Sequence, residues 1–112
     1  MTTVKFVLDG SGNVKQLTVS GHSGYAQEGS DIVCAAVSAS VQMLEMQIAQ
    51  VIGEKKASFT ERDAEISYII PDLSGKDAET VNNMVGGFMR FMQSVSKHYE
   101  DYLTFETEVK KC

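Results

Sequence analysis

A chain of 112 residues is long enough for one hydrophobic core and too short for two, so we expect a single domain over residues 1–112. Apolar residues make up 43% of it, which excludes a disordered chain, and no apolar run approaches the roughly 20 residues that a membrane-spanning helix needs. The net charge of −5 argues against nucleic-acid binding, which requires a basic surface, and suits attraction to a basic protein.

The first two predicted elements are strands that form a hairpin. Apolar and polar side chains alternate over residues 4–8 and again over about 14–21, which is typical of half-buried strands. Residues 9–13, Asp-Gly-Ser-Gly-Asn, are of types that accept positive φ. We therefore expect a tight turn there and antiparallel pairing of the two strands.

Apolar residues then recur at helical spacing over about 31–52, which predicts a long helix. Ser30 or Asp31 can cap it, since both side chains accept hydrogen bonds from first-turn amides. We expect Met43 and Met46 to lie beside this apolar stripe and to widen the apolar face.

Three further strands and a second helix complete the predicted fold. The strands lie over about 56–62, 65–70 and 102–109, and Pro71 ends the middle one. With the second helix before the last strand, the order is β-β-α-β-β-α-β. This order predicts the α+β class, a two-layer sandwich in which two helices cover a largely antiparallel sheet.

The second helix is predicted to begin at Ser74 or Asp77 and to reach about His98. Gly86 and Gly87 in its middle each cost about 1 kcal/mol relative to alanine, which a close helix–helix crossing would offset. Its methionines and phenylalanines form a stripe that is typical of core. Any exposed part of this stripe is better explained by a dimer face than by a cofactor pocket.

Residues 21–38 hold the most informative local pattern. His22 ends a predicted strand and Cys34 falls in the first turn of a predicted helix, with Gly21, Gly24 and Gly29 beside or between them. A helix N-terminus and a nearby imidazolium both favour the thiolate, the reactive form of cysteine. The glycines allow the positive φ values that would bring His22 back towards Cys34. The hypothesis is a Cys–His pair for nucleophilic catalysis; the alternative is a buried cysteine and an unrelated surface histidine.

The segment Gly-His-x-Gly-Tyr-Ala-x-x-Gly-x-Asp-Ile-Val-Cys-Ala-Ala-Val-Ser resembles the signature of the ribosomal-processing cysteine proteases, the Prp family. The layout of the whole chain is similar to that family as well, but only residues 21–38 are specific. The resemblance implies that Cys34 is the nucleophile, His22 its partner and Asp31 the motif aspartate. It also implies a homodimer. The implied substrate is the N-terminal extension of large-subunit ribosomal protein L twenty-seven, with aromatic residues just before the cut.

Asp31 and Ser38 are candidate supporting residues. Asp31 is interpreted either as a helix cap or as a carboxylate that orients His22 or contacts a basic substrate, and the sequence leaves both open. Ser38 follows Cys34 by one helical turn and shares its face. Backbone N–H groups of the first turn, including that of Cys34, are the expected donors to a developing oxyanion.

Two other functions stay open at this point. One is a non-catalytic ribosome assembly factor that binds a basic ribosomal protein, with Cys34 merely buried. The other is a thiol-dependent hydrolase of small acyl substrates. Reactivity of the Cys34 thiol distinguishes a protease from an assembly factor. The relative turnover of peptides and small esters distinguishes a protease from a hydrolase of small acyl substrates.

No cofactor and no metal are expected. The two histidines and two cysteines lack the spacing of a zinc site, and the glycine-rich segment lacks the phosphate-binding motifs. The first residues carry no signal-peptide pattern, and two cysteines make no disulfide framework. We therefore expect a cytoplasmic protein with Cys112 as a reduced surface thiol, and neither a nucleic acid nor a membrane as partner.

Overall fold

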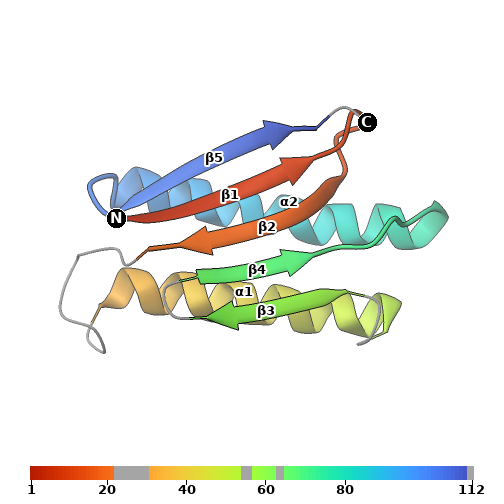
Figure 1. Cartoon of the computed structure of the whole chain (residues 1–112), viewed down its shortest axis with the longest axis horizontal. Helices are drawn as coiled ribbons and strands as arrows, with labels where there is room; N and C mark the ends of the chain where they lie inside the picture. The colour runs from red at the N-terminus through yellow and green to blue at the C-terminus, as the bar shows by residue number, and fades with distance from the viewer. Residues whose placement is uncertain (22–30, 54–56, 63–64, 111–112) are drawn as a thin grey trace.

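The computed structural model describes residues 1–21, 31–53, 57–62 and 65–110. Five strands form one sheet in the order β3-β4-β2-β1-β5 (Figure 1). The strands are β1 (Thr2–Leu8), β2 (Val14–Ser20), β3 (Ser58–Arg62), β4 (Glu65–Ile69) and β5 (Leu103–Val109). β1 and β2 form the predicted hairpin, and Gly12 in its turn has a φ of 86°.

The sheet is mixed. Three of its four strand pairs are antiparallel, whereas β5 runs parallel to β1, from Leu103 opposite Thr2 to Val109 opposite Leu8. This is possible because α2 (Gly75–His98) carries the chain back along the sheet between β4 and β5. The predicted α+β class, the order of elements and the largely antiparallel pairing are confirmed.

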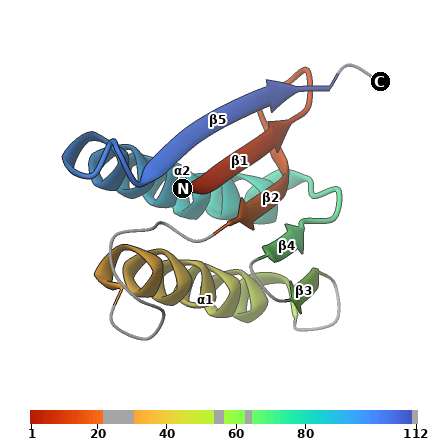
Figure 2. The same cartoon turned by 60° about the vertical axis from the view of Figure 1, so that its left-hand side comes forward.

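Both helices pack on the same face of the sheet (Figures 1 and 2). α1 (Ile32–Ile52) lies along the β3–β4 side and α2 lies along the side of β1 and β5. Their inner faces and the sheet bury one core, which includes Val4, Phe6, Leu17, Val37, Val41, Leu44, Ile48, Tyr68, Val81, Val85, Phe88 and Met92. Each large apolar side chain buried in this way contributes on the order of 1.5–3 kcal/mol. The core thus fixes both helices to the sheet, and with them the first turn of α1.

Met43 and Met46 do not join this core, contrary to the prediction. Their side chains are 62% and 66% exposed, while Leu44 and Ile48 of the same helix are buried. Successive residues of an α-helix are turned by about 100°, so a buried face at Leu44 and Ile48 turns Met46 to the far side and Met43 to the flank. The two methionines therefore add apolar surface to the outside of the domain.

The helix α1 is also long and apolar enough, by length and composition, to cross a membrane. The expectation that no apolar run approaches that length is therefore wrong for α1. The core helix of a soluble protein meets the same criteria. One face of α1 is buried against the rest of the domain, through Val33, Val37, Val41, Leu44, Ile48 and Ile52. This buried face accounts for part of the apolar composition of α1, and exposed residues such as Met43 and Met46 account for another part.

Gly86 and Gly87 are not explained by a close helix crossing, so that expectation is wrong too. A Cβ atom built on either glycine would meet no heavy atom within 4 Å outside its own surroundings on the helix. The two glycines therefore lower the stability of α2 without a compensating close contact among the described residues.

We predict that Gly86→Ala raises the free energy of unfolding by about 0.5–1 kcal/mol, because alanine loses less backbone entropy in a helix. Urea unfolding of the purified protein measures it. Gly12→Ala is the matched control: Gly12 has equally open surroundings but a φ of +86°, so the same substitution there should destabilise. A loss of stability in Gly86→Ala would contradict this and show that α2 requires a residue without a side chain at this position.

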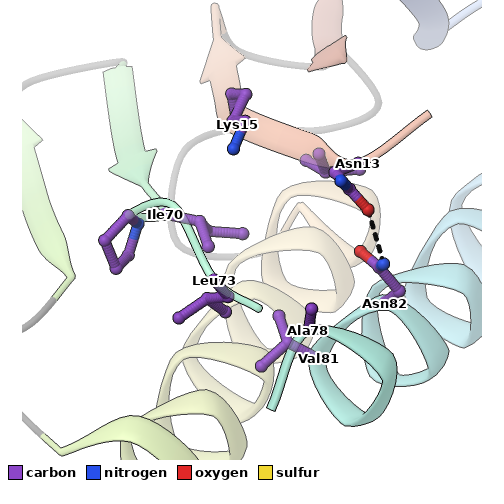
Figure 3. A pocket seen from close by; sticks show the side chains of 9 residues that line it. Asn13, Lys15, Ile70, Leu73, Ala78, Val81 and Asn82 are labelled. Carbon is purple, nitrogen blue, oxygen red and sulfur yellow. Dashed lines mark hydrogen bonds between the residues drawn. The ribbon is translucent and has the colours of Figure 1, made fainter. Parts of the chain in front are cut away.

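Side-chain contacts join α2 to the end of the β1–β2 hairpin that carries the turn (Figure 3). Asn82 of α2 donates a hydrogen bond of 2.6 Å to the side chain of Asn13, and Leu73 and Val81 help to line a cavity of about 10 Å³ beside it. Such a space holds about one water. The hydrogen bond from Lys15 to Asp72 raises the pKa of the Lys15 ammonium. This end fastens α2 to the hairpin, and the space is too small for a ligand.

Candidate active site

Cys34 lies in the first turn of α1, as predicted. Asp31 is the N-cap, with extended backbone angles, and its Oδ1 accepts hydrogen bonds from the N–H groups of Val33 and Cys34, both at 3.0 Å. The Asp31 side chain is buried and the Cys34 side chain is half-buried. Of the two predicted caps, Ser30 and Asp31, the structure assigns the cap to Asp31. The thiol thus sits at the positive end of the helix dipole.

The backbone N–H of Cys34 already has an acceptor, which changes the expected oxyanion site. It donates to Asp31 Oδ1, and the next amide, that of Ala35, donates to the Asp31 carbonyl at 3.0 Å. Ile32 carries the first-turn amide for which the described residues show no acceptor. An oxyanion at this helix end would reach the N–H of Cys34 only by displacing the Asp31 carboxylate. The expectation that this amide is available to the substrate is therefore not met.

Thr2, the first residue of β1, brings a hydroxyl to Cys34. Its Oγ1 lies 3.9 Å from Cys34 Sγ and donates a hydrogen bond of 3.2 Å to the carbonyl of Gly21. The residue is only 1% exposed, and its backbone N–H donates to the carbonyl of Tyr102 at 2.9 Å. Thr2 is not among the residues predicted from the sequence, because a polar residue at the start of an alternating strand, 32 positions from the cysteine, carries no local signal.

Gly21 ends the hairpin beside Thr2 and requires the absence of a side chain. Its φ is +81°, and a Cβ atom there would lie 2.5 Å from the carbonyl oxygen of Met1. This confirms the predicted positive φ at Gly21. His22, Gly24 and Gly29 lie outside the described residues, so the approach of His22 to Cys34 stays a prediction.

Ser38 is half-buried on α1, one turn beyond Cys34. Its side chain makes no hydrogen bond to another residue within the described ranges, and its supporting role stays a prediction. The exposed His98 lies at the end of α2, where its Nδ1 is 2.8 Å from the carbonyl of Ser94. That position suits a structural role at the negative end of the helix dipole.

The sequence predicts no metal site, and the described residues contain none. Within residues 1–21, 31–53, 57–62 and 65–110, no group of three or more His, Cys, Asp or Glu side chains is placed to hold an ion. His22 and Cys112 lie outside these ranges, so the absence of a metal stays a prediction.

Two substitutions of Asp31 distinguish its role as helix cap from the role of its negative charge in catalysis. We predict that Asp31→Ala lowers the free energy of unfolding by about 1 kcal/mol, since two amides lose their acceptor, whereas Asp31→Asn leaves it nearly unchanged. Both hydrogen bonds need only an acceptor oxygen, which asparagine keeps, whereas the orientation of His22 predicted from the sequence needs the negative charge. We therefore predict that Asp31→Asn loses peptide cleavage at nearly unchanged urea stability. Near-wild-type cleavage by Asp31→Asn would restrict the residue to its cap.

Comparison with known proteins gives a family match and several solved structures of the same fold. The model of the family described as cysteine protease Prp matches residues 1–104. The ribosomal processing protease Prp from S. aureus, solved with a covalently linked product peptide, has a TM-score of 0.81 at 17% identity, over 96% of this chain and 100% of that one. Its complex with a substrate peptide gives 0.74 at 16% identity, with the same coverage.

A third solved structure, SMU.848 from Streptococcus mutans, has a TM-score of 0.76 at 22% identity and covers 98% of this chain and 96% of its own. Comparison with curated proteins gives no significant match. The solved structures share the fold of this chain, while the family match extends over both β1 and the Cys34 helix turn. The chain therefore belongs to the Prp family of cysteine proteases.

Proposed function

We propose that this protease removes the N-terminal extension of large-subunit ribosomal protein L twenty-seven, with Cys34 as nucleophile and His22 as its base. The observation that carries the proposal is the placement of Cys34 in the first turn of a helix, within a chain that matches the cysteine protease family over residues 1–104. The related protein from S. aureus is described as a ribosomal processing protease that holds a substrate peptide. That description supports a peptide substrate for the present chain.

The proposed reaction is acyl transfer through a thioester. His22 takes the proton of the Cys34 thiol, and Sγ attacks the scissile carbonyl carbon. The tetrahedral intermediate collapses as the C–N bond breaks, and His22 returns the proton to the leaving amine. Water, deprotonated by His22, then hydrolyses the thioester and restores the thiol. The helix N-terminus stabilises the thiolate before the attack and when hydrolysis of the thioester releases it.

The oxyanion of this intermediate needs N–H donors. The amide of Ile32 meets this need directly, and that of Cys34 does so once the substrate draws it from Asp31. Substrate binding would drive this exchange of the acceptor of the Cys34 amide, so the oxyanion site would be complete only in the enzyme–substrate complex.

The charge of the chain suits a ribosomal protein as partner. Fifteen Asp and Glu residues against ten Lys and Arg give a net charge of −5. Ribosomal proteins are basic because they bind RNA, so long-range attraction favours their encounter with an acidic enzyme. We accordingly propose a cytoplasmic enzyme that acts on this protein and binds neither nucleic acid nor membrane.

A homodimer forms part of the proposal, and an apolar groove supports it. The groove runs between α1 and α2, has a volume of about 460 Å³, and is lined among others by Met43, Gly87 and Phe91. Met43 and Phe91 are 62% and 47% exposed in the single chain. Exposed apolar surface of this kind is typical of interfaces. Gly87 keeps the groove open at the expense of helix stability.

Cleavage of synthetic peptides tests the proposed substrate class. A peptide with aromatic residues just before the cut should be hydrolysed, whereas an acyl ester of similar size should turn over slowly. Faster turnover of the ester would favour a hydrolase of small acyl substrates. Binding without cleavage of either would favour an assembly factor and would contradict the proposal.

Analytical ultracentrifugation tests the dimer. Phe91→Glu places a charge in the groove and should shift the wild-type dimer to monomer, while Val109→Glu, at a 57% exposed position on β5, should not. A monomeric wild-type protein, or a dimer that survives Phe91→Glu, would contradict the proposed interface.

A further inference from the structure

The hydroxyl of Thr2 is a buried polar group with two neighbours and a single hydrogen to share. Oγ1 lies 3.2 Å from the carbonyl oxygen of Gly21 and 3.9 Å from Cys34 Sγ. The carbonyl can only accept, so the hydroxyl hydrogen points to it while Cys34 is a thiol. In that state an oxygen lone pair of Thr2 faces the sulfur and accepts the weak S–H donor.

Ionisation of Cys34 reverses this preference. The thiolate is an acceptor only, and a lone pair of Thr2 beside it is unfavourable. Rotation about the Cβ–Oγ1 bond turns the hydrogen from the Gly21 carbonyl to Sγ, and no covalent bond breaks. A hydrogen bond to an ionised acceptor is about twice as strong as one between neutral groups, so the exchange favours the thiolate. At 3.9 Å the contact is long for a hydrogen bond to sulfur, and it should tighten when the thiolate forms.

We propose that Thr2 is a positioning residue for the nucleophile: its hydroxyl turns from Gly21 to the Cys34 sulfur and stabilises the thiolate. The inference rests on the proposed role of Cys34 and adds a donor from β1, opposite the helix end. It also gives Gly21 a second function, because its carbonyl holds the hydroxyl ready in the resting thiol state. Gly21 directly precedes His22, so the residue that fixes the thiolate also contacts the backbone beside its base.

Other ionisable groups on the elements that meet at Thr2 and Cys34 also bear on the thiolate. The carboxylate of Asp31 opposes it by like charge, although two amides share that carboxylate. The α-amino group of Met1 precedes Thr2 and favours it. The segment between α2 and β5 contributes Tyr99, Glu100, Asp101 and Tyr102. A change confined to the hydroxyl of Thr2 leaves every one of these groups in place.

A purely structural role is the alternative to be excluded. A threonine at the start of a strand fits a β-branched position, and the hydrogen bond to Gly21 alone would satisfy its buried hydroxyl. Such a role predicts lower stability on substitution but no change in how Cys34 ionises. The pH dependence of thiol alkylation therefore separates the two roles.

The experiment uses the full chain with Cys112→Ser, so that iodoacetamide reports on Cys34 alone. Thr2→Val keeps the shape of the side chain and removes the hydroxyl. Its alkylation profile should move to higher pH by about one unit, with roughly tenfold slower labelling on the acid side and the same limiting rate at high pH. Thr2→Ser restores the hydroxyl and should restore the profile. Thr3→Val, at the next and half-buried position of β1, is the matched control and should leave the profile unchanged.

If Thr2→Val does not fold, a second pair of variants provides the same comparison. Thr2→Ala and Thr2→Ser both lack the methyl group and differ only in the hydroxyl, so the same shift should separate them. Peptide cleavage should show a lower kcat at nearly unchanged KM in both hydroxyl-free variants. Identical alkylation profiles with and without the hydroxyl would overturn the inference. Alkylation needs no peptide substrate, so this outcome differs from failure of the proposed function, in which Cys34→Ala would still cleave.

Discussion

Cys34→Ser should retain the fold and lose peptide cleavage to the background rate. The change is nearly isosteric, and the half-buried side chain lies at the start of α1, outside the fully buried core. A serine hydroxyl is far less acidic than a thiol, so the helix N-terminus that stabilises a thiolate does not generate an alkoxide. Removal of a nucleophile costs on the order of 10⁴-fold or more in kcat. Liquid chromatography of the peptide products measures the loss, and thermal unfolding verifies the fold.

Two further variants complete this test. Cys112→Ser removes the other thiol of the chain and should leave cleavage unchanged. Cys34→Ala removes the side-chain nucleophile altogether and should be as inactive as the serine variant. Cleavage retained by Cys34→Ala would remove the nucleophilic role of this residue.

His22→Ala should lower turnover by about 10²–10⁴-fold, the usual effect of removing a general base. It should also move the alkylation of Cys34 to higher pH, because an imidazolium beside a thiolate favours ionisation of the thiol. Steady-state cleavage and iodoacetamide labelling, both in the Cys112→Ser background, measure the two effects.

His98→Ala is the matched control for the base. It removes the second histidine of the chain, which is exposed at the end of α2 and held by the carbonyl of Ser94. Cleavage and alkylation should both stay at wild-type values. If His22→Ala instead left the alkylation profile where it was, His22 and Cys34 would not interact, and another base would have to be sought.

Much of the fold could be predicted because its elements carry strong local patterns. Alternation defined β1 and β2, helical spacing defined α1 and α2, and their order predicted the α+β sandwich that the structure confirms. The position of Cys34 followed from the same patterns, because a cap and an apolar repeat locate the first turn of a helix.

The remaining features depend on contacts between distant residues. Met43 and Met46 are apolar, and only the orientation of α1 on the sheet shows that they face outward. Gly86 suggested a close crossing that the packing does not contain. Thr2 meets Cys34 only because β1 begins beside the start of α1, and no spacing in the chain encodes that. The choice between Ser30 and Asp31 as cap is a local feature, but the sequence leaves it open because both side chains can accept hydrogen bonds from the same amides.

The most direct test of the central claim compares the loss of activity with the modification of Cys34. The Cys112→Ser protein is titrated with iodoacetamide at neutral pH, and each aliquot is assayed for peptide cleavage and mapped by mass spectrometry. The account predicts that the remaining activity falls in a one-to-one ratio with alkylation of Cys34 and reaches zero when that residue is fully modified. Cleavage that persists in protein with fully alkylated Cys34 would contradict it.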